Sequence, residues 1–106
     1  MRANIQKVLT AFSEGRAAKG DAKNTCSTDG QVIYSYRLAL AHRDAAGNVF
    51  MRLTRREAID AAKQFSKTGA TTRAQYDAVA NFVEAYDHDA HVRDVAREAL
   101  KIASAA

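Results

Sequence analysis

The chain has 106 residues, of which 47% are apolar and 26% are charged, a composition typical of one globular domain and not of a disordered segment. No apolar run is long enough to span a bilayer and the first residues lack the apolar stretch of a secretory signal, so we expect neither a membrane protein nor a secreted one. The single cysteine, Cys26, excludes an internal disulfide, and a cytoplasmic protein is therefore expected.

The net charge of +4 is distributed unevenly along the chain. Residues 1–56 contain ten Lys and Arg against four Asp and Glu, whereas residues 57–106 contain six against eight. A basic first half attracts polyanions, so the charge points to nucleic acid or an acidic protein surface as a partner. A basic balance is also common in small domains without such a partner, and that alternative stays open at this stage.

A helix is predicted near the N-terminus, followed by a loop. Apolar residues recur there at the spacing of one helix face, at Ile5, Val8, Leu9 and Phe12. Asn4 is a suitable N-cap and Gly15 a suitable C-terminal stop. Residues 15–24 contain no large apolar side chain, so we expect a basic loop.

The clearest β-strand pattern follows this loop. Asp29 and Gly30 suit a two-residue hairpin turn, and residues 32–43 alternate as one strand. The face of that strand predicted to meet the core carries Val32, Tyr34, Tyr36, Leu38 and Leu40, and the outward face carries Ile33, Ser35, Arg37, Ala39, Ala41 and Arg43. A four-residue turn over 44–47 leads into a third strand over 48–53, in which Met51 is expected opposite Leu40 and Leu53 opposite Leu38.

Helices are predicted for the rest of the chain. Thr54 and Glu57 fit a capping box that opens a helix ended by Gly69, and Thr72 and Gln75 fit a second capping box. The apolar faces of these two helices are expected at Ala58, Ile59, Ala62 and Phe65, and at Tyr76, Val79, Val83 and Tyr86. A last helix is expected near 90–103. The fold class is therefore α+β, one domain over residues 1–106 with an N-terminal helix, a three-stranded antiparallel β-meander and two to three C-terminal helices.

The outward face of this predicted sheet is the main candidate for a binding surface. It combines arginines with an aromatic ring, and further arginines open the next helix; these residues are Arg37, Arg43, Phe50, Arg52, Arg55 and Arg56. Arginines hold phosphates and an aromatic ring stacks on a base, which is how several single-strand binders work. The alternative is that a helix covers this face, so that its apolar residues form a second small core and the arginines lie at the rim.

Three further patterns suggest a DNA-reading motif, a metal site and a ribonuclease site, and each has a feature against it or an alternative explanation. Residues 57–80 allow a helix-turn-helix that reads DNA with Thr72, Arg73, Gln75 and Tyr76, although the turn is long. Residues 87–91 contain two Asp and two His that suit either a helix cap or a metal site, and that choice is left open. A small ribonuclease would use Tyr34, Tyr36, Arg37, His42 and Arg43, but the alternation places His42 with the tyrosines and separates them from the arginines. We therefore expect no enzymatic activity, and we assign no catalytic residue, metal ligand or cofactor.

Parts of the chain resemble a family of small uncharacterised bacteriophage and prophage accessory proteins. Residues 24–36 match the hairpin pattern N-T-x-S-T-D-G-x-x-I-Y-S-Y of that family, and residues 12–17 match the preceding F-x-x-G-x-A segment. Residues 71–75 match a T-T-x-x-Q helix start, where Arg73 replaces the usual serine. The resemblance covers roughly residues 9–80. It implies a phage accessory protein in the cytoplasm of a host cell, and it supplies no active site.

Small phage accessory proteins often act by binding. The resemblance therefore implies a non-enzymatic inhibitor of a host defence or nucleoprotein complex, of the anti-CRISPR kind. The alternative is direct nucleic-acid binding through the basic sheet face, and a toxin-like ribonuclease is a remote third. The expected partner is a host protein or nucleoprotein complex or nucleic acid itself, with no membrane involved, and the sequence does not determine the oligomeric state.

Overall fold

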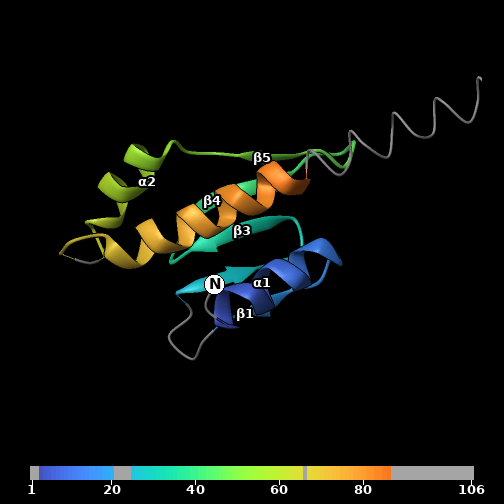
Figure 1. Ribbon diagram of the computed structural model, residues 1–106, viewed down its shortest axis with the longest axis horizontal. Coiled ribbons are helices and arrows are strands. Elements are labelled where there is room, and N and C mark those ends of the chain that lie inside the picture. Colours follow the sequence, from blue (N-terminus) through green and yellow to red (C-terminus); the bar gives the residue numbers. More distant parts are fainter. Residues whose placement is uncertain (1–2, 21–24, 66, 87–106) are drawn as a thin grey trace, which may run out of the picture.

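The computed structural model describes residues 3–20, 25–65 and 67–86, in which five antiparallel strands form one sheet (Figure 1). The strands are β1 (Ala18–Lys19), β2 (Cys26–Thr28), β3 (Val32–Ser35), β4 (Leu38–Arg43) and β5 (Val49–Met51). They lie side by side in chain order, so the sheet is a meander. The α+β class and the antiparallel meander are confirmed, whereas the predicted count of three strands is wrong.

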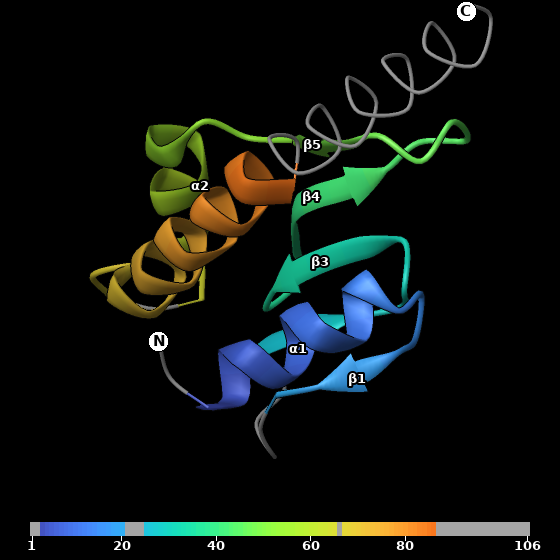
Figure 2. The ribbon, with the colours of Figure 1, turned by 45° about the vertical axis from the view of Figure 1, so that its right-hand side comes forward.

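The described helices lie on one side of the sheet and at its end (Figure 2). α1 (Ala3–Ser13) packs against β1, β2 and β3, and a second helix over residues 70–86 lies beside it on the same face. The Phe12 and Phe82 rings join these two helices edge to face at 5.9 Å. α2 (Arg55–Ala62) contacts β4 beyond the end of β5. No helix in the described part of the chain combines the length and apolarity needed to cross a membrane.

The N-terminal helix forms as its apolar spacing predicts. Its four predicted core residues are buried. The helix already includes Ala3, so Asn4 lies inside it and not at the predicted N-cap position, and its Oδ1 atom accepts a hydrogen bond from the amide of Ile5. Gly15 adopts a φ of 72°, at which the chain turns away from the helix. The expected loop over 15–24 is only partly right, because β1 lies within it and residues 21–24 are outside the described residues.

The predicted single strand over 32–43 is in fact two strands. Tyr36 adopts a φ of 54°, a left-handed backbone conformation that residues other than glycine rarely take. Ser35 pairs with Leu38 across the turn. The turn contains no glycine, asparagine or proline, so the alternation of apolar and polar residues continues through it. The periodicity therefore could not reveal the hairpin between β3 and β4.

A bulge in β4 changes which of its residues face the helices. Ile33 pairs with Ala41 but Tyr34 pairs with Ala39, so Leu40 is the extra residue and both Leu40 and Ala41 are buried. The β4–β5 turn has five residues, because Arg43 pairs with Val49 and Ala41 pairs with Met51. The predicted four-residue turn is therefore wrong, yet Met51 still packs against the core because the bulge restores its orientation. Leu38 and Leu53 are likewise partly buried against it, as expected.

The β2–β3 hairpin forms, with a turn longer than predicted. β2 ends at Thr28 and β3 begins at Val32, so three residues, 29–31, separate the two strands. Gly30 adopts a φ of 97° there, and a Cβ atom at this position would lie 2.5 Å from the carbonyl oxygen of Gly15. Only glycine satisfies both the backbone conformation and the close approach.

The helices after the sheet bury most of the apolar residues predicted for them, which are Ala58, Ala62, Tyr76, Val79 and Val83, but only the first predicted helix start is correct. The capping box of Thr54 and Glu57 is present at α2. α2 ends at Ala62 and not at Gly69, and Phe65 lies beyond it with 40% of its surface exposed. Gly69 instead precedes the helix over 70–86. The second predicted capping box is wrong, because Thr72 lies inside that helix and is fully buried. The predicted helix near 90–103 lies outside the described residues.

A buried polar network holds the helix over 70–86 to the sheet. The hydroxyl of Ser35 donates to Oε1 of Gln75 and contacts the hydroxyl of Thr72 at 2.9 Å, so Thr72 is the donor in that second bond. Gln75 also donates through Nε2 to the hydroxyl of Thr25. Around it lies the apolar core, which includes Leu9, Phe12, Ile33, Leu40 and Val79.

Candidate nucleic-acid interface

The sheet face opposite α1 and the helix over 70–86 is not covered by any helix among the described residues (Figures 1 and 2). Strand pairing places two rows of side chains on it. One row joins Lys19, Ser27, Tyr34 and Ala39, and the other joins Val32, His42 and Phe50. Arg52 follows two residues after Phe50, where its amide still bonds to the carbonyl of Leu40. We call these eight residues the open face.

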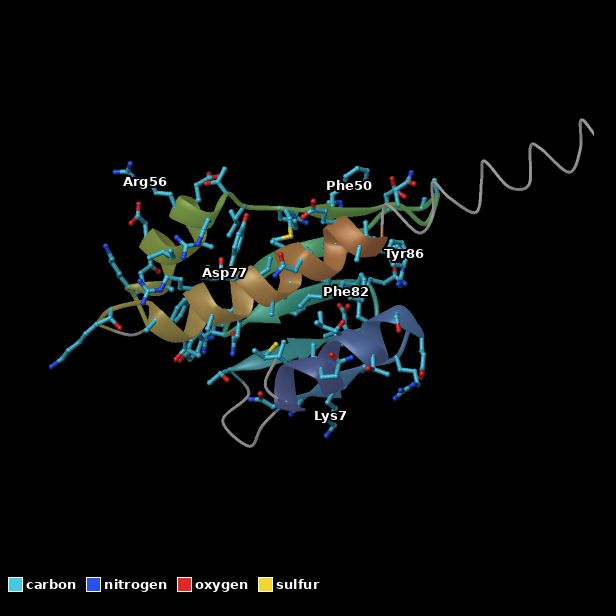
Figure 3. All side chains as sticks on the ribbon, viewed as in Figure 1. Lys7, Phe50, Arg56, Asp77, Phe82 and Tyr86 are labelled. Atoms are coloured by element: carbon cyan, nitrogen blue, oxygen red, sulfur yellow. The ribbon has the colours of Figure 1, made fainter. Side chains whose placement is uncertain are left out.

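Aromatic rings cross the open face on three neighbouring strands. Tyr34 lies on β3, His42 on β4 and Phe50 on β5. The His42 and Phe50 rings are 5.8 Å apart and tilted by 38°, and Phe50 is 47% exposed on the outer strand (Figure 3). Large exposed apolar side chains in a folded domain mark a contact surface when they occur together with other rings.

Cations lie at both ends of the open face. Lys19 is on β1 and Arg52 follows β5, so about 19 Å of sheet separates their strands. A third cation, Arg37, lies in the β3–β4 turn. All three are exposed, and none forms a hydrogen bond or ion pair through its side chain with the part of the chain that the structure describes. Their charges are therefore available to a ligand.

One polar atom of the open face is unsatisfied. Nδ1 of His42 is buried and has no hydrogen-bond partner within the described residues. Buried polar atoms without partners are rare in folded proteins, and an ordered water or an ion is the usual partner in such cases.

Arg43 belongs to the opposite face, which corrects its assignment to the binding surface. Its guanidinium lies 4.3 Å from the centre of the Phe12 ring and donates to the carbonyls of Gly30 at 2.7 Å and Phe12 at 2.9 Å. The Phe12 carbonyl is at the C-terminal end of α1, where a positive charge is favoured. The Arg43 guanidinium thus stabilises the packing of α1 and the β2–β3 turn against the sheet.

The two arginines that open α2 are also separated from the open face. Arg55 forms an ion pair with Asp77, with nitrogen–oxygen distances of 2.9 and 3.3 Å, and this hydrogen bond raises the pKa of Arg55 above its ordinary value. Arg56 is exposed and reaches Asp60 only at 4.0 Å (Figure 3). Of the six predicted site residues, the structure brings only Phe50 and Arg52 together on the open face, with Arg37 at the hairpin tip.

Sequence reasoning missed three members of this surface. Lys19 was assigned to a loop, because a strand of two residues leaves no pattern. Tyr34 and His42 were assigned correctly to one common face, but that face was taken for the core. The structure exchanges the two faces of β3, since Ile33 and Ser35 are fully buried while Val32 and Tyr34 are only partly buried. Which face a helix covers is not encoded in the alternation itself.

The remaining sequence interpretations are not met by the geometry. Thr72, Gln75 and Tyr76 are buried, so they cannot read DNA and the helix-turn-helix interpretation is wrong. The five residues considered for a ribonuclease do not converge, since Tyr34 and His42 are on the open face, Arg43 is on the covered face, and Tyr36 and Arg37 form a turn.

No metal centre is evident from side-chain grouping in residues 3–20, 25–65 and 67–86. No three or more His, Cys, Asp or Glu residues gather there as metal ligands would. The acidic and histidine pattern at 87–91 lies outside the described residues. The open face carries aromatic rings on which planar ligand rings can stack and cations that can hold phosphate groups. No protein-family model, curated protein sequence or solved structure matches the chain significantly.

Proposed function

We propose that this protein acts by binding and that its open face binds single-stranded nucleic acid. The observation that carries this proposal is the presence of Tyr34, His42 and Phe50 on three neighbouring strands of the open face, between the unpaired cations Lys19 and Arg52. Antiparallel sheets with exposed rings stack two or three bases in this way. The width of about 19 Å between the outer strands is sufficient for a few nucleotides.

The two kinds of side chain have separate roles in this proposal. Each ring that stacks on a base contributes about 1–3 kcal/mol, without strong sequence preference. Each cation that neutralises a phosphate adds a salt-dependent contribution. Duplex DNA does not expose its base faces, so the proposal favours a single strand over a duplex. It requires no catalytic step and no cofactor.

A second candidate function is inhibition of a host nucleoprotein complex. The resemblance of residues 9–80 to phage accessory proteins favours it. Such an inhibitor would use the same open face, and its contact would be with protein that normally holds nucleic acid. The two candidates differ in whether isolated nucleic acid binds.

The test is binding of a labelled single strand of about eight nucleotides, followed by fluorescence anisotropy at several salt concentrations. Phe50→Ala should weaken binding by at least about fivefold, the lower end of the stacking contribution. Phe65→Ala is the matched control, because Phe65 is exposed to a similar extent but stacks on Tyr36 at the hairpin tip.

The charge contribution has its own variant and control. Truncation of Arg37 and Arg52 together should reduce the slope of affinity against salt, with folding unaffected because exposed charges contribute little to stability. Lys7→Ala is the control, since Lys7 is exposed on α1, which lies on the side of the sheet opposite the open face (Figure 3). Absence of single-strand binding by the wild type would refute the main proposal. Nuclease-resistant capture of one host complex, lost in Phe50→Ala, would then support the inhibitor.

A further inference from the structure

A hollow of about 310 Å³ lies at the β1 end of the open face. Its lining consists of Ala17, Ala18, Lys19, Ser27, Thr28, Asp29 and Tyr34. Three of these, Lys19, Ser27 and Tyr34, form one row of the open face, and Asp29 lines the hollow from the β2–β3 turn. The hollow therefore continues the proposed binding surface, and its volume is close to the lower end for small-ligand sites.

A carboxylate in this hollow is unexpected on a surface that attracts phosphates. Oδ1 of Asp29 accepts hydrogen bonds from the amides of Gln31 at 2.8 Å and Val32 at 2.9 Å. These bonds lower the pKa of Asp29, so the group is charged at neutral pH. Its second oxygen, Oδ2, has no partner within the described residues, and the side chain is exposed. The Asp29 carboxylate is thus held by the turn amides, and it lines the same hollow as Tyr34 and Lys19.

These three groups discriminate between the parts of a nucleotide. The Tyr34 ring offers a stacking surface and Lys19 offers a charge for phosphate, whereas Asp29 repels phosphate and accepts from N–H or O–H donors. The exocyclic amino group of cytosine is such a donor, while thymine presents a carbonyl oxygen at the same position. A carboxylate that faces this position therefore favours the amino-bearing base, because thymine has no donor there.

We infer that this hollow is a base-selective subsite for one nucleotide of the bound single strand, and that Asp29 makes it prefer a base with an exocyclic amino group. The inference rests on the proposed function, because the subsite has no role unless a single strand occupies the open face. Cytosine and thymine are the sharpest pair of probes, since they have the same ring size and differ where Asp29 would act.

The experiment compares oligo(dC) with oligo(dT) of about eight nucleotides on the full chain. The wild type should bind oligo(dC) at least about fivefold more tightly, because a charge-assisted hydrogen bond is gained and a repulsion avoided. Asp29→Asn keeps Oδ1 for the turn but replaces Oδ2 with an N–H donor. The preference should therefore disappear or reverse toward oligo(dT).

Asp44→Asn is the matched control. Oδ1 of Asp44 accepts from the amides of Ala46 and Asn48 in the β4–β5 turn, so it has the same charge and the same local role, but it does not line the hollow. This variant should retain the preference for oligo(dC). A change equal to that of Asp29→Asn would assign the effect to net charge and overturn the inference.

The outcomes separate the subsite from the proposed function. Binding of both oligonucleotides within about twofold by the wild type would refute the subsite and leave single-strand binding intact. Failure to bind either would refute both. Should Asp29→Asn not fold, the ratio of the wild-type affinities for oligo(dC) and oligo(dT) still tests the subsite, together with an NMR titration of the wild-type protein with each oligonucleotide. In that titration the Ser27 and Asp29 amides should shift more than with oligo(dT), and equal shifts would contradict the subsite.

Discussion

Replacement of Arg43 by alanine should destabilise the fold, because this arginine connects three separate elements. Its guanidinium extends from β4 to the carbonyl of Gly30 in the β2–β3 turn, to the carbonyl of Phe12 at the end of α1, and over the Phe12 ring. α1 has no basic residue in its own last turn, so Arg43 supplies the positive charge favoured at that end.

The size of the effect follows from these contacts. A hydrogen bond from a charged donor contributes about 1.5–3 kcal/mol, and a cation over a ring about 0.5–1 kcal/mol. Ordering and desolvation of the side chain offset part of this, so Arg43→Ala should lower the free energy of unfolding by about 2–4 kcal/mol. Arg43→Lys keeps the charge but cannot reach both carbonyls as a fork, and about 1–2 kcal/mol should be lost.

Urea unfolding followed by circular dichroism measures both variants. In a domain of this size the alanine variant should also melt at least about 10 °C below the wild type. Arg56→Ala is the control, since its side chain is 93% exposed and it should change stability by no more than about 0.5 kcal/mol. If Arg43→Ala unfolds at the same urea concentration as Arg56→Ala, the contacts described for Arg43 do not stabilise the fold and the reasoning is refuted.

Three further changes test the fold and its turns by the same urea measurement. Ser35→Ala leaves Thr72 and Gln75 without their buried hydroxyl partner and should lower the free energy of unfolding by about 1–3 kcal/mol. Ser13→Ala on the surface should lower it by at most about 0.5 kcal/mol, and equal losses would contradict the network. Gly30→Ala should cost about 2–4 kcal/mol, since both φ and the nearby carbonyl oppose a Cβ atom, but Gly47→Ala only about 1 kcal/mol, because its φ of 89° is unfavourable while nothing lies within 4 Å. The lowered pKa of Asp29, caused by two turn amides, means that its contribution to stability is present at neutral pH and lost on acidification below about pH 4. The stability difference between wild type and Asp29→Asn should therefore shrink with falling pH, and a constant difference would exclude this linkage.

Local chemistry explains the elements that the sequence predicted correctly. The apolar spacing in α1 needs only one buried face, and the Thr54–Glu57 capping box is complete within four residues. The hairpin around Asp29 and Gly30 is also local, because the Asp29 side chain and the positive φ of Gly30 make the turn by themselves. The mistakes occur where the same local pattern is compatible with two structures.

The Tyr36 turn and the Thr72 capping pattern are two such cases. Tyr36 takes a left-handed conformation that the residue types in the turn do not predict. Its ring stacks on that of Phe65, which is 29 positions further along the chain. Thr72 fits a helix start by its spacing to Gln75, but both side chains instead bond to Ser35 on the sheet. Long-range packing therefore decided between the alternatives.

For the candidate site, the sequence by itself determined that Tyr34 and His42 share one face of the strands and that the first half of the chain is basic. Only the tertiary structure decided which face the helices cover, and it reversed the expected assignment. The physical reason is that the Tyr36 turn, the bulge at Leu40 and the packing of α1 and the helix over 70–86 depend on long-range contacts, which the alternation of residue types does not contain. Arg43 thus became a support for α1, while Phe50 and Arg52 remained on the surface with Tyr34, His42 and Lys19.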